Sequence, residues 1–148
     1  MTEEERMEFG EFVLAGVKDW NAGNRESFLT RYGPGSGFTG PGGSTLSGVK
    51  GAALFYDTYH SAFPDCELRP ENMFTDGEQG CVEGTFTGTH LGELKLADGR
   101  VVAPTGNRVV VHYAERWVVR DDVVSYIRLY YDQVELLTQL GVETVGPR

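Results

Sequence analysis

With 148 residues, 40% of them hydrophobic and 24% charged, the chain has the size and composition of a single globular domain, spanning residues 1–148. Its formal net charge of −9 repels phosphate backbones, which argues against nucleic-acid binding. No apolar run approaches the roughly 20 residues that span a bilayer, and the acidic start MTEEERMEF is unlike a secretory signal, so we expect a cytoplasmic protein without a membrane contact.

The two cysteines, Cys66 and Cys81, are too few for a disulfide framework. Two free thiols are the simplest interpretation, with one disulfide as the alternative. Neither cysteine lies in a CxxC motif, and no HxH or HxxxH spacing occurs, so no metal site is predicted. The chain also has neither a GxGxxG motif at the start of a helix nor a Walker A motif, which argues against nucleotide binding.

The first helix is predicted from Thr2 to Asn21, where apolar residues recur at the spacing of a buried helix face. Thr2 and Glu5 have the spacing of a capping box. The sequence NAGN at 21–24 ends this helix, and a short second helix is predicted over Arg25–Tyr32.

Residues 33–48, GPGSGFTGPGGSTLSG, are rich in glycine. This composition favours a flexible loop, with a short strand around Phe38 as the alternative. Ser47 is placed to cap a third helix over Val49–Ala62, and Pro64 ends that helix.

The rest of the chain has the alternating pattern of strands, separated by the turn sequences DGEQG, ADGR and RDD. The predicted strands cover Cys66–Phe74, residues 81–96, Val109–Val119 and Val123–Asp132. Helices followed by antiparallel strands are the pattern of the α+β class.

A two-residue turn at Asp121 and Asp122 would fix the pairing of the last two strands. The pairs that follow share one sheet face: Val111 with Asp132, Tyr113 with Tyr130, Glu115 with Arg128, and Trp117 with Tyr126. The other face would carry His112, Ile127, Leu129 and Tyr131. A shift of one residue would exchange the faces, so finding Glu115 and Arg128 on opposite faces would contradict this pairing.

Five motifs follow one another in the chain: HSAFPD (60–65), GTFTGTHLGEL (84–94), PTGNRV (104–109), ERWVVRDDVVSYIRLYYD (115–132) and LLTQLG (136–141). In order and spacing they resemble the SnoaL-like polyketide cyclase family, within the nuclear transport factor 2-like fold. The resemblance covers residues 13–141 approximately. It implies a cone-shaped α+β barrel, in which a curved antiparallel sheet wraps around two to three N-terminal helices and leaves a pocket at its open end.

The resemblance also implies a function. It indicates a cofactor-free cyclase or isomerase that acts on a small hydrophobic, polyketide-like carbonyl compound by acid/base catalysis, closing a ring by aldol chemistry. In such cyclases an aspartate near the end of the last long strand is the acid/base group, and it matches Asp132. A homodimer through the outer sheet face is implied as well, and Ile127, Leu129 and Tyr131 give it mild support if that face lacks helix cover.

Three residues are catalytic candidates. Asp132 is the first, because a carboxylate among aromatic side chains is desolvated, and its raised pKa suits proton removal beside a carbonyl. The alternative is that Asp132 caps the following turn, DQVELL. His60 either reaches the pocket mouth or caps the third helix. His90 either faces the pocket or orders the neighbouring strand, whereas His112 is expected on the sheet surface or in a dimer contact.

Ten residues are candidates for substrate binding: Trp20, Tyr32, Phe55, Tyr59, Phe86, Tyr113, Glu115, Trp117, Arg128 and Tyr130. The aromatic ones would also suit an ordinary core. Two other functions stay open. One is a small-molecule-binding module without chemistry. The other is an epoxide hydrolase-like activity, for which Glu115, Arg128 and Asp132 would only roughly replace an Asp–Arg–Asp relay. A ketosteroid isomerase-like reaction would use Tyr113 or Tyr130 at the oxyanion.

Overall fold

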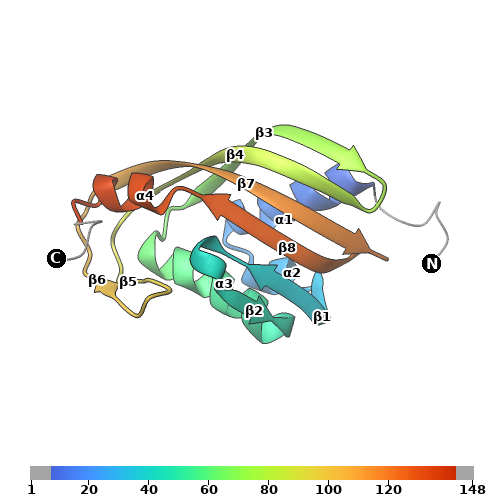
Figure 1. The fold of residues 1–148 in the computed structure, drawn as a ribbon, viewed down its shortest axis with the longest axis horizontal. Helices are drawn as coiled ribbons and strands as arrows, with labels where there is room; N and C mark the ends of the chain where they lie inside the picture. Colours follow the sequence, from blue (N-terminus) through green and yellow to red (C-terminus); the bar gives the residue numbers. More distant parts are fainter. Residues whose placement is uncertain (1–7, 143–148) are drawn as a thin grey trace.

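Two helices come first in the chain, two strands separate them from a third helix, and the remaining strands follow, so the predicted α+β class is confirmed (Figure 1). The computed structural model describes residues 8–142, so the capping box proposed at Thr2 and Glu5 lies outside the described residues. Helix α1 (Phe9–Ala22) buries one face, and it ends at Gly23, whose φ of 70° is easily adopted by glycine. No helix within residues 8–142 is long and apolar enough to cross a membrane.

The next two helices differ from their predictions in detail. Helix α2 (Arg25–Leu29) is shorter than predicted, and the Asn24 side chain caps it by accepting a hydrogen bond from the Ser27 backbone N–H. Helix α3 (Gly48–Ala62) agrees with its predicted range to within one residue. Ser47 precedes α3, but its side chain makes no capping hydrogen bond, so the predicted cap is wrong.

A six-stranded sheet covers the three helices with its concave face (Figure 1). The sheet is curved but does not close, because strands β2 and β3 form its two edges. The strand order is β2 (Thr45–Ser47), β1 (Tyr32–Thr39), β8 (Val123–Tyr131), β7 (Arg108–Arg120), β4 (Gln79–Thr89) and β3 (Glu67–Asp76). A small separate sheet pairs β5 (Leu94–Lys95) with β6 (Val101–Val102), and the short helix α4 (Gln133–Gln139) follows β8.

The glycine-rich segment forms β1, so the strand alternative is right and the flexible loop is wrong for residues 33–39. β1 pairs with β8 in parallel, whereas the resemblance implies an antiparallel sheet throughout. Gly37 lies beside Tyr126 of β8, and a Cβ atom at Gly37 would make ordinary van der Waals contact with that ring, at 3.4 Å. The short 3-10 turn at Pro41–Gly43 then leads into β2.

The pairing of β7 with β8 begins as predicted and then shifts. Asp121 and Asp122 both have positive φ, as a two-residue hairpin turn requires, and Arg120 pairs with Val123. Ser125 is then an extra residue in β8. It lies between Val124, which pairs with Val119, and Tyr126, which pairs with Val118, and so forms a bulge. Beyond the bulge every side chain of β8 lies on the face opposite to the predicted one.

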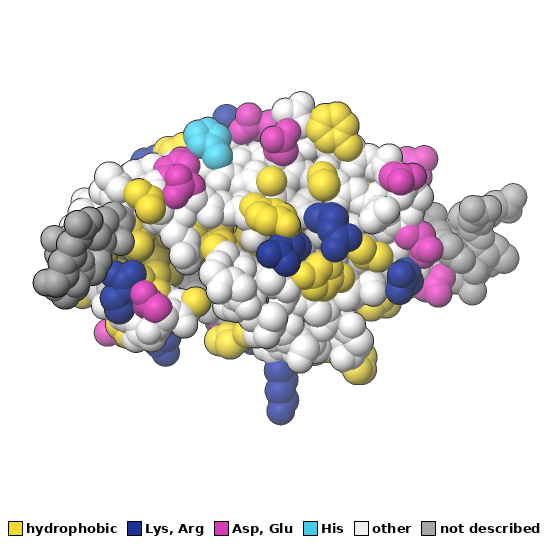
Figure 2. Space-filling model, viewed as in Figure 1, with side chains coloured by type: hydrophobic (Ala, Val, Ile, Leu, Met, Phe, Trp, Pro, Cys, Tyr) yellow, Lys and Arg dark blue, Asp and Glu magenta, His cyan; other side chains and the backbone are white. Residues whose placement is uncertain are grey.

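The predicted face of this hairpin is therefore wrong beyond the bulge. Glu115 pairs with Leu129, and Arg128 pairs with Arg116, so Glu115 and Arg128 lie on opposite faces. Arg128 and Tyr130 lie on the outer face, where the Arg128 guanidinium is 5.2 Å from the centre of the Tyr130 ring. Figure 2 shows this face, with basic side chains among hydrophobic ones.

Candidate active site

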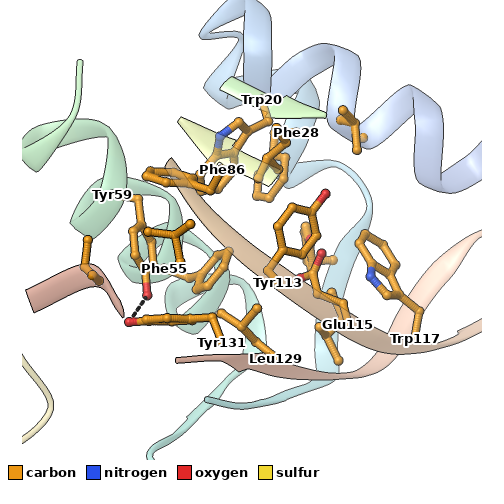
Figure 3. Close-up of a pocket in the computed structure, with 17 residues that line it drawn as sticks. Trp20, Phe28, Phe55, Tyr59, Phe86, Tyr113, Glu115, Trp117, Leu129 and Tyr131 are labelled. Atoms are coloured by element: carbon orange, nitrogen blue, oxygen red, sulfur yellow. Dashed lines mark hydrogen bonds between the residues drawn. The ribbon is translucent and has the colours of Figure 1, made fainter. Parts of the chain in front are cut away.

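An apolar cavity of about 60 Å³ lies between the helices and the concave face of the sheet (Figure 3). Most of the residues predicted to bind a substrate line it: Trp20, Tyr32, Phe55, Tyr59, Phe86, Tyr113, Glu115 and Trp117. The helices supply one wall and β7 supplies another, because alternate residues of β7 point inward.

Glu115 is the acid of this cavity, and it is partly buried. Tyr113 and Trp117 flank it on the inner face of β7, and Leu129 lies opposite on β8. Desolvation by these neighbours raises the pKa of Glu115 to about 7, against a smaller lowering by the Trp117 indole N–H. No salt bridge to Glu115 forms within residues 8–142, so no cation there holds it in the charged form.

The cavity also contains buried hydrogen-bond donors. The Tyr113 hydroxyl has no hydrogen-bond partner within the described part of the chain, and the buried indole N–H of Trp117 interacts only weakly, with the Glu115 carboxyl. Such groups are uncommon in folded proteins, because an unpaired buried donor costs free energy. Burial also raises the pKa of Tyr113 above its ordinary value, so this hydroxyl keeps its proton near neutral pH. The cavity thus offers donors next to an acid.

The side of the cavity away from Trp117 is formed by two more tyrosines (Figure 3). The hydroxyls of Tyr59, on α3, and Tyr131, the last residue of β8, lie 3.2 Å apart and form a hydrogen bond. Burial raises the pKa of Tyr59 well above its ordinary value, so this hydroxyl also stays protonated.

Asp132 does not line this cavity but a second, more open hollow, together with Arg128 and Tyr130, and its catalytic role stays a prediction. Asp132 is the N-cap residue of α4, and its side chain accepts hydrogen bonds from the backbone N–H groups of Val134 (2.9 Å) and Glu135 (3.3 Å). The capping alternative is therefore confirmed. The physical reason is the bulge in β8, which turns the side chains of Arg128 and Tyr130 outward, with Asp132 following directly after the strand.

We expect Asp132→Ala to lower the free energy of unfolding by about 1 kcal/mol, because two backbone donors of α4 lose their partner. Asp132→Asn is the matched control, since asparagine caps helices about as well as aspartate. Urea denaturation followed by circular dichroism measures both variants. An alanine variant as stable as the wild type would show that the cap contributes nothing to stability.

His60 and His90 also lie outside the cavity. The His60 ring stacks on Tyr56 at 3.7 Å, and its two ring nitrogens each lie 3.0 Å from a backbone carbonyl oxygen, of Tyr56 and of Trp20. His60 therefore ties the end of α3 to the end of α1. The buried His90 accepts a hydrogen bond at Nδ1 from the Thr105 backbone N–H (3.2 Å), and burial lowers its pKa. The contacts of His60 agree with its structural alternative, whereas His90 orders the loop before β7 and not a neighbouring strand.

His112 lies on the sheet surface, as predicted, and contacts Glu135 at 3.1 Å. The relay considered for an epoxide hydrolase-like activity cannot form between Glu115 and Arg128, because the sheet separates them. Cys66 and Cys81 are both free, as predicted. Within residues 8–142, the His, Cys, Asp and Glu side chains form no group of three that could hold a metal ion.

The prediction missed several cavity residues, above all Ile127, Leu129 and Tyr131 of β8. The sequence placed them on the outer face, as support for a dimer, whereas they face the cavity. A usable signal was present: these three apolar side chains alternate with Arg128 and Tyr130, and the more apolar set of a half-buried strand faces the core. Phe28, from the short helix α2, was missed as well.

Comparison with known proteins gives a consistent assignment. The family model of the SnoaL-like domain matches residues 13–127. No curated protein sequence shows significant similarity to the chain. Among solved structures, a proposed SnoaL-like polyketide cyclase from Jannaschia sp. CCS1 has a TM-score of 0.78 at 23% identity, covering 90% of this chain and 92% of its own.

Two further structures resemble this fold. IdmH, a proposed polyketide cyclase from Streptomyces antibioticus, has a TM-score of 0.73 at 20% identity, covering 90% of this chain and 98% of its own. A protein with a ketosteroid isomerase-like fold from Catenulispora acidiphila, in complex with trimethylamine, has a TM-score of 0.74 at 16% identity, covering 93% of this chain and 98% of its own. Identities this low establish the shared fold and leave the chemistry to the residues of the site.

Proposed function

Because this chain belongs to the SnoaL-like domain family, we propose that it is a cyclase or isomerase that acts on a hydrophobic carbonyl compound, with Glu115 as its acid/base group. The observation that carries the proposal is the Glu115 carboxyl in an apolar cavity, with a pKa of about 7. A group with this pKa is populated in both protonation states near neutral pH, so it can accept a proton and return it.

The reaction begins when the Glu115 carboxylate removes a proton from the carbon beside a carbonyl group. The electron pair of that C–H bond moves to the carbonyl oxygen and gives an enolate. Tyr113 is the proposed donor to this oxygen, because its hydroxyl has no partner among the described residues, whereas the Trp117 indole N–H acts on the Glu115 carboxyl. Donors already in place cost no rearrangement when the negative charge develops.

The second half of the reaction decides the product. In a cyclase, the enolate carbon attacks a second carbonyl group of the same molecule, and Glu115 returns its proton to the new alkoxide. In an isomerase, the substrate has a C=C bond next to the deprotonated carbon, so the enolate is a dienolate, and Glu115 returns the proton to the far carbon of that C=C bond. Either sequence conserves the proton and the electron pairs, so it requires no cofactor.

Deuterium exchange into 2-tetralone in D₂O, followed by proton NMR, tests this chemistry without knowledge of the natural substrate. The protein is expected to accelerate exchange at the carbons beside the carbonyl. The rate should rise with pH and level off above about pH 7, because Glu115 must be deprotonated to act as a base. Exchange at the buffer rate across this range, with 2-tetralone bound, would contradict the proposal.

A binding module without chemistry is the second candidate. The aromatic walls and the unpaired Tyr113 hydroxyl favour it, because they suit ligand binding whether or not a proton moves. The exchange experiment separates the two functions, since a binding module would hold 2-tetralone without exchanging its protons.

The homodimer through the outer sheet face stays a prediction, and so does the cytoplasmic location. The residues first cited for the dimer face the cavity, but Val110 and Tyr130 are exposed on the outer face at 43% and 53%. Light scattering after size-exclusion chromatography measures the mass in solution.

A further inference from the structure

We infer that the cavity around Glu115 is the inner half of a longer substrate site, and that the Tyr59–Tyr131 hydroxyl pair separates it from an outer half. This inference rests on the proposed function only in one respect, that the end of the substrate beside Glu115 is the end that reacts. It makes Tyr59 and Tyr131 the residues that decide whether a substrate can occupy both halves.

The size of the inner cavity is the first observation. Its volume of about 60 Å³ holds a few water molecules, whereas small-molecule sites typically have roughly 300–1,000 Å³. A compound with fused rings, 2-tetralone included, is therefore too large for the inner cavity alone, and it reaches Glu115 only if its other end extends beyond this cavity. A substrate that places its reacting carbon beside Glu115 must extend through one wall.

A second cavity adjoins the first and provides the missing room. Its volume is about 320 Å³, and it lies between β1, β2, α3 and the loop that follows β5. Its outer part is apolar, with Phe38, Leu46, Leu54 and Leu96 among the residues that line it. The two cavities together reach the size of a typical small-molecule site.

The two cavities share one wall. Tyr59 and Tyr131 line both of them, together with Phe55, Ile127 and Leu129. Within this wall the Tyr59 and Tyr131 side chains meet from opposite elements, α3 and β8, and their only polar contact among the described residues is the 3.2 Å hydrogen bond between their hydroxyls (Figure 3). Rotation of the Tyr131 ring breaks one neutral hydrogen bond, whose net contribution to stability is small. The Tyr59 ring is held more firmly, because it also packs against Trp20, Phe55 and Phe86.

The chemistry of the pair indicates what crosses it. Each hydroxyl can donate and accept a hydrogen bond. When the two tyrosines separate, each hydroxyl can therefore exchange the other tyrosine for an oxygen atom of the ligand. The ligand then has one carbonyl beside Glu115, a second oxygen between Tyr59 and Tyr131, and an apolar body against Leu46 and Leu96.

The test uses 9-fluorenone, a flat tricyclic ketone that has no hydrogen beside its carbonyl. Because fluorenone cannot undergo the proposed proton transfer, its binding is independent of catalysis by Glu115. Methyl NMR of the ¹³C-labelled protein reports each half separately, since Val111 lines only the inner cavity and Leu96 only the outer one. In the wild type, both methyl signals are expected to shift with one common Kd.

Removal of the wall is the decisive change. Tyr131→Ala is expected to lower the Kd for fluorenone at least threefold, with Val111 and Leu96 still shifting together. Tyr130→Ala, at the neighbouring exposed position on the outer face, is the matched control and should leave the Kd unchanged. Tyr59→Phe keeps the ring and removes the hydrogen bond, so it should tighten binding by a smaller factor and serves as the second variant if Tyr131→Ala does not fold.

Two results would overturn the inference. One is a Kd that is unchanged or raised in the folded variants at Tyr131 and Tyr59. The other is a shift of Leu96 without Val111, which would mean that the ligand stays in the outer cavity. Neither result bears on the proposed chemistry, because the exchange of 2-tetralone is judged by its own rate and pH dependence, whichever cavity holds the second ring.

Discussion

Glu115→Gln is expected to reduce the exchange of 2-tetralone protons by about 10²- to 10⁴-fold, the range typical for loss of a general acid/base group. Glutamine has nearly the size of glutamate, so the cavity keeps its walls and the ligand still binds. The amide cannot accept the proton, and the rate should fall close to that of buffer. Proton NMR in D₂O at pH 8, where Glu115 is mostly deprotonated, gives the largest difference.

Asp132→Asn is the control for this experiment, because the family resemblance points to Asp132 and the cavity points to Glu115. Asparagine still caps α4, so the fold and the exchange rate should both be retained. The opposite outcome, loss of exchange in Asp132→Asn and retention in Glu115→Gln, would show that the acid/base group is Asp132. Binding of 9-fluorenone, measured in both variants, verifies that each retains its site.

Much of the fold could be predicted from patterns that act over a few residues. The apolar spacing of α1, the turn residues Asp121 and Asp122, and the alternation of β7 all depend on neighbours in the sequence, and all are present. The glycine-rich strand β1 was harder to predict, because glycine has a low intrinsic strand propensity. β1 forms through its pairing with β8 and β2, which a composition argument does not contain.

The residues that line the site could not be predicted, because they depend on a bulge at one residue, Ser125, which no local sequence pattern indicates. Ser125 has no cross-strand partner, and the bulge it creates decides whether β8 offers Leu129 and Tyr131 or Arg128 and Tyr130 to the interior. The two alternatives predict different chemistry. With Arg128 opposite, Glu115 would be an ion-paired carboxylate, whereas with Leu129 opposite it is desolvated and its pKa is raised. The identity of the acid thus follows from strand register.

The raised pKa of Glu115 also predicts how stability depends on pH. The folded protein binds this proton with a pKa of about 7, and the unfolded chain binds it with the ordinary value of 4.5. Below pH 4.5 both states carry the proton, so Glu115 has no effect there. Between pH 4.5 and pH 7 the unfolded chain loses the proton first, so the free energy of unfolding falls as the pH rises. Above pH 7 the loss is complete, at about 3 kcal/mol.

Glu115→Gln removes this titration and should therefore show a smaller loss of stability on the alkaline side. The quantity to measure is the difference in free energy of unfolding between the variant and the wild type, from urea denaturation at intervals from pH 4 to pH 8.5. This difference should move in favour of the variant by about 3 kcal/mol across the range, whatever its value at pH 4. A difference independent of pH would mean that Glu115 is solvated in the folded protein. The desolvation that raises the pKa of this carboxyl also lowers the stability of the wild type at alkaline pH. Glu115→Gln would therefore lose the reaction and avoid this loss of stability for the same physical reason.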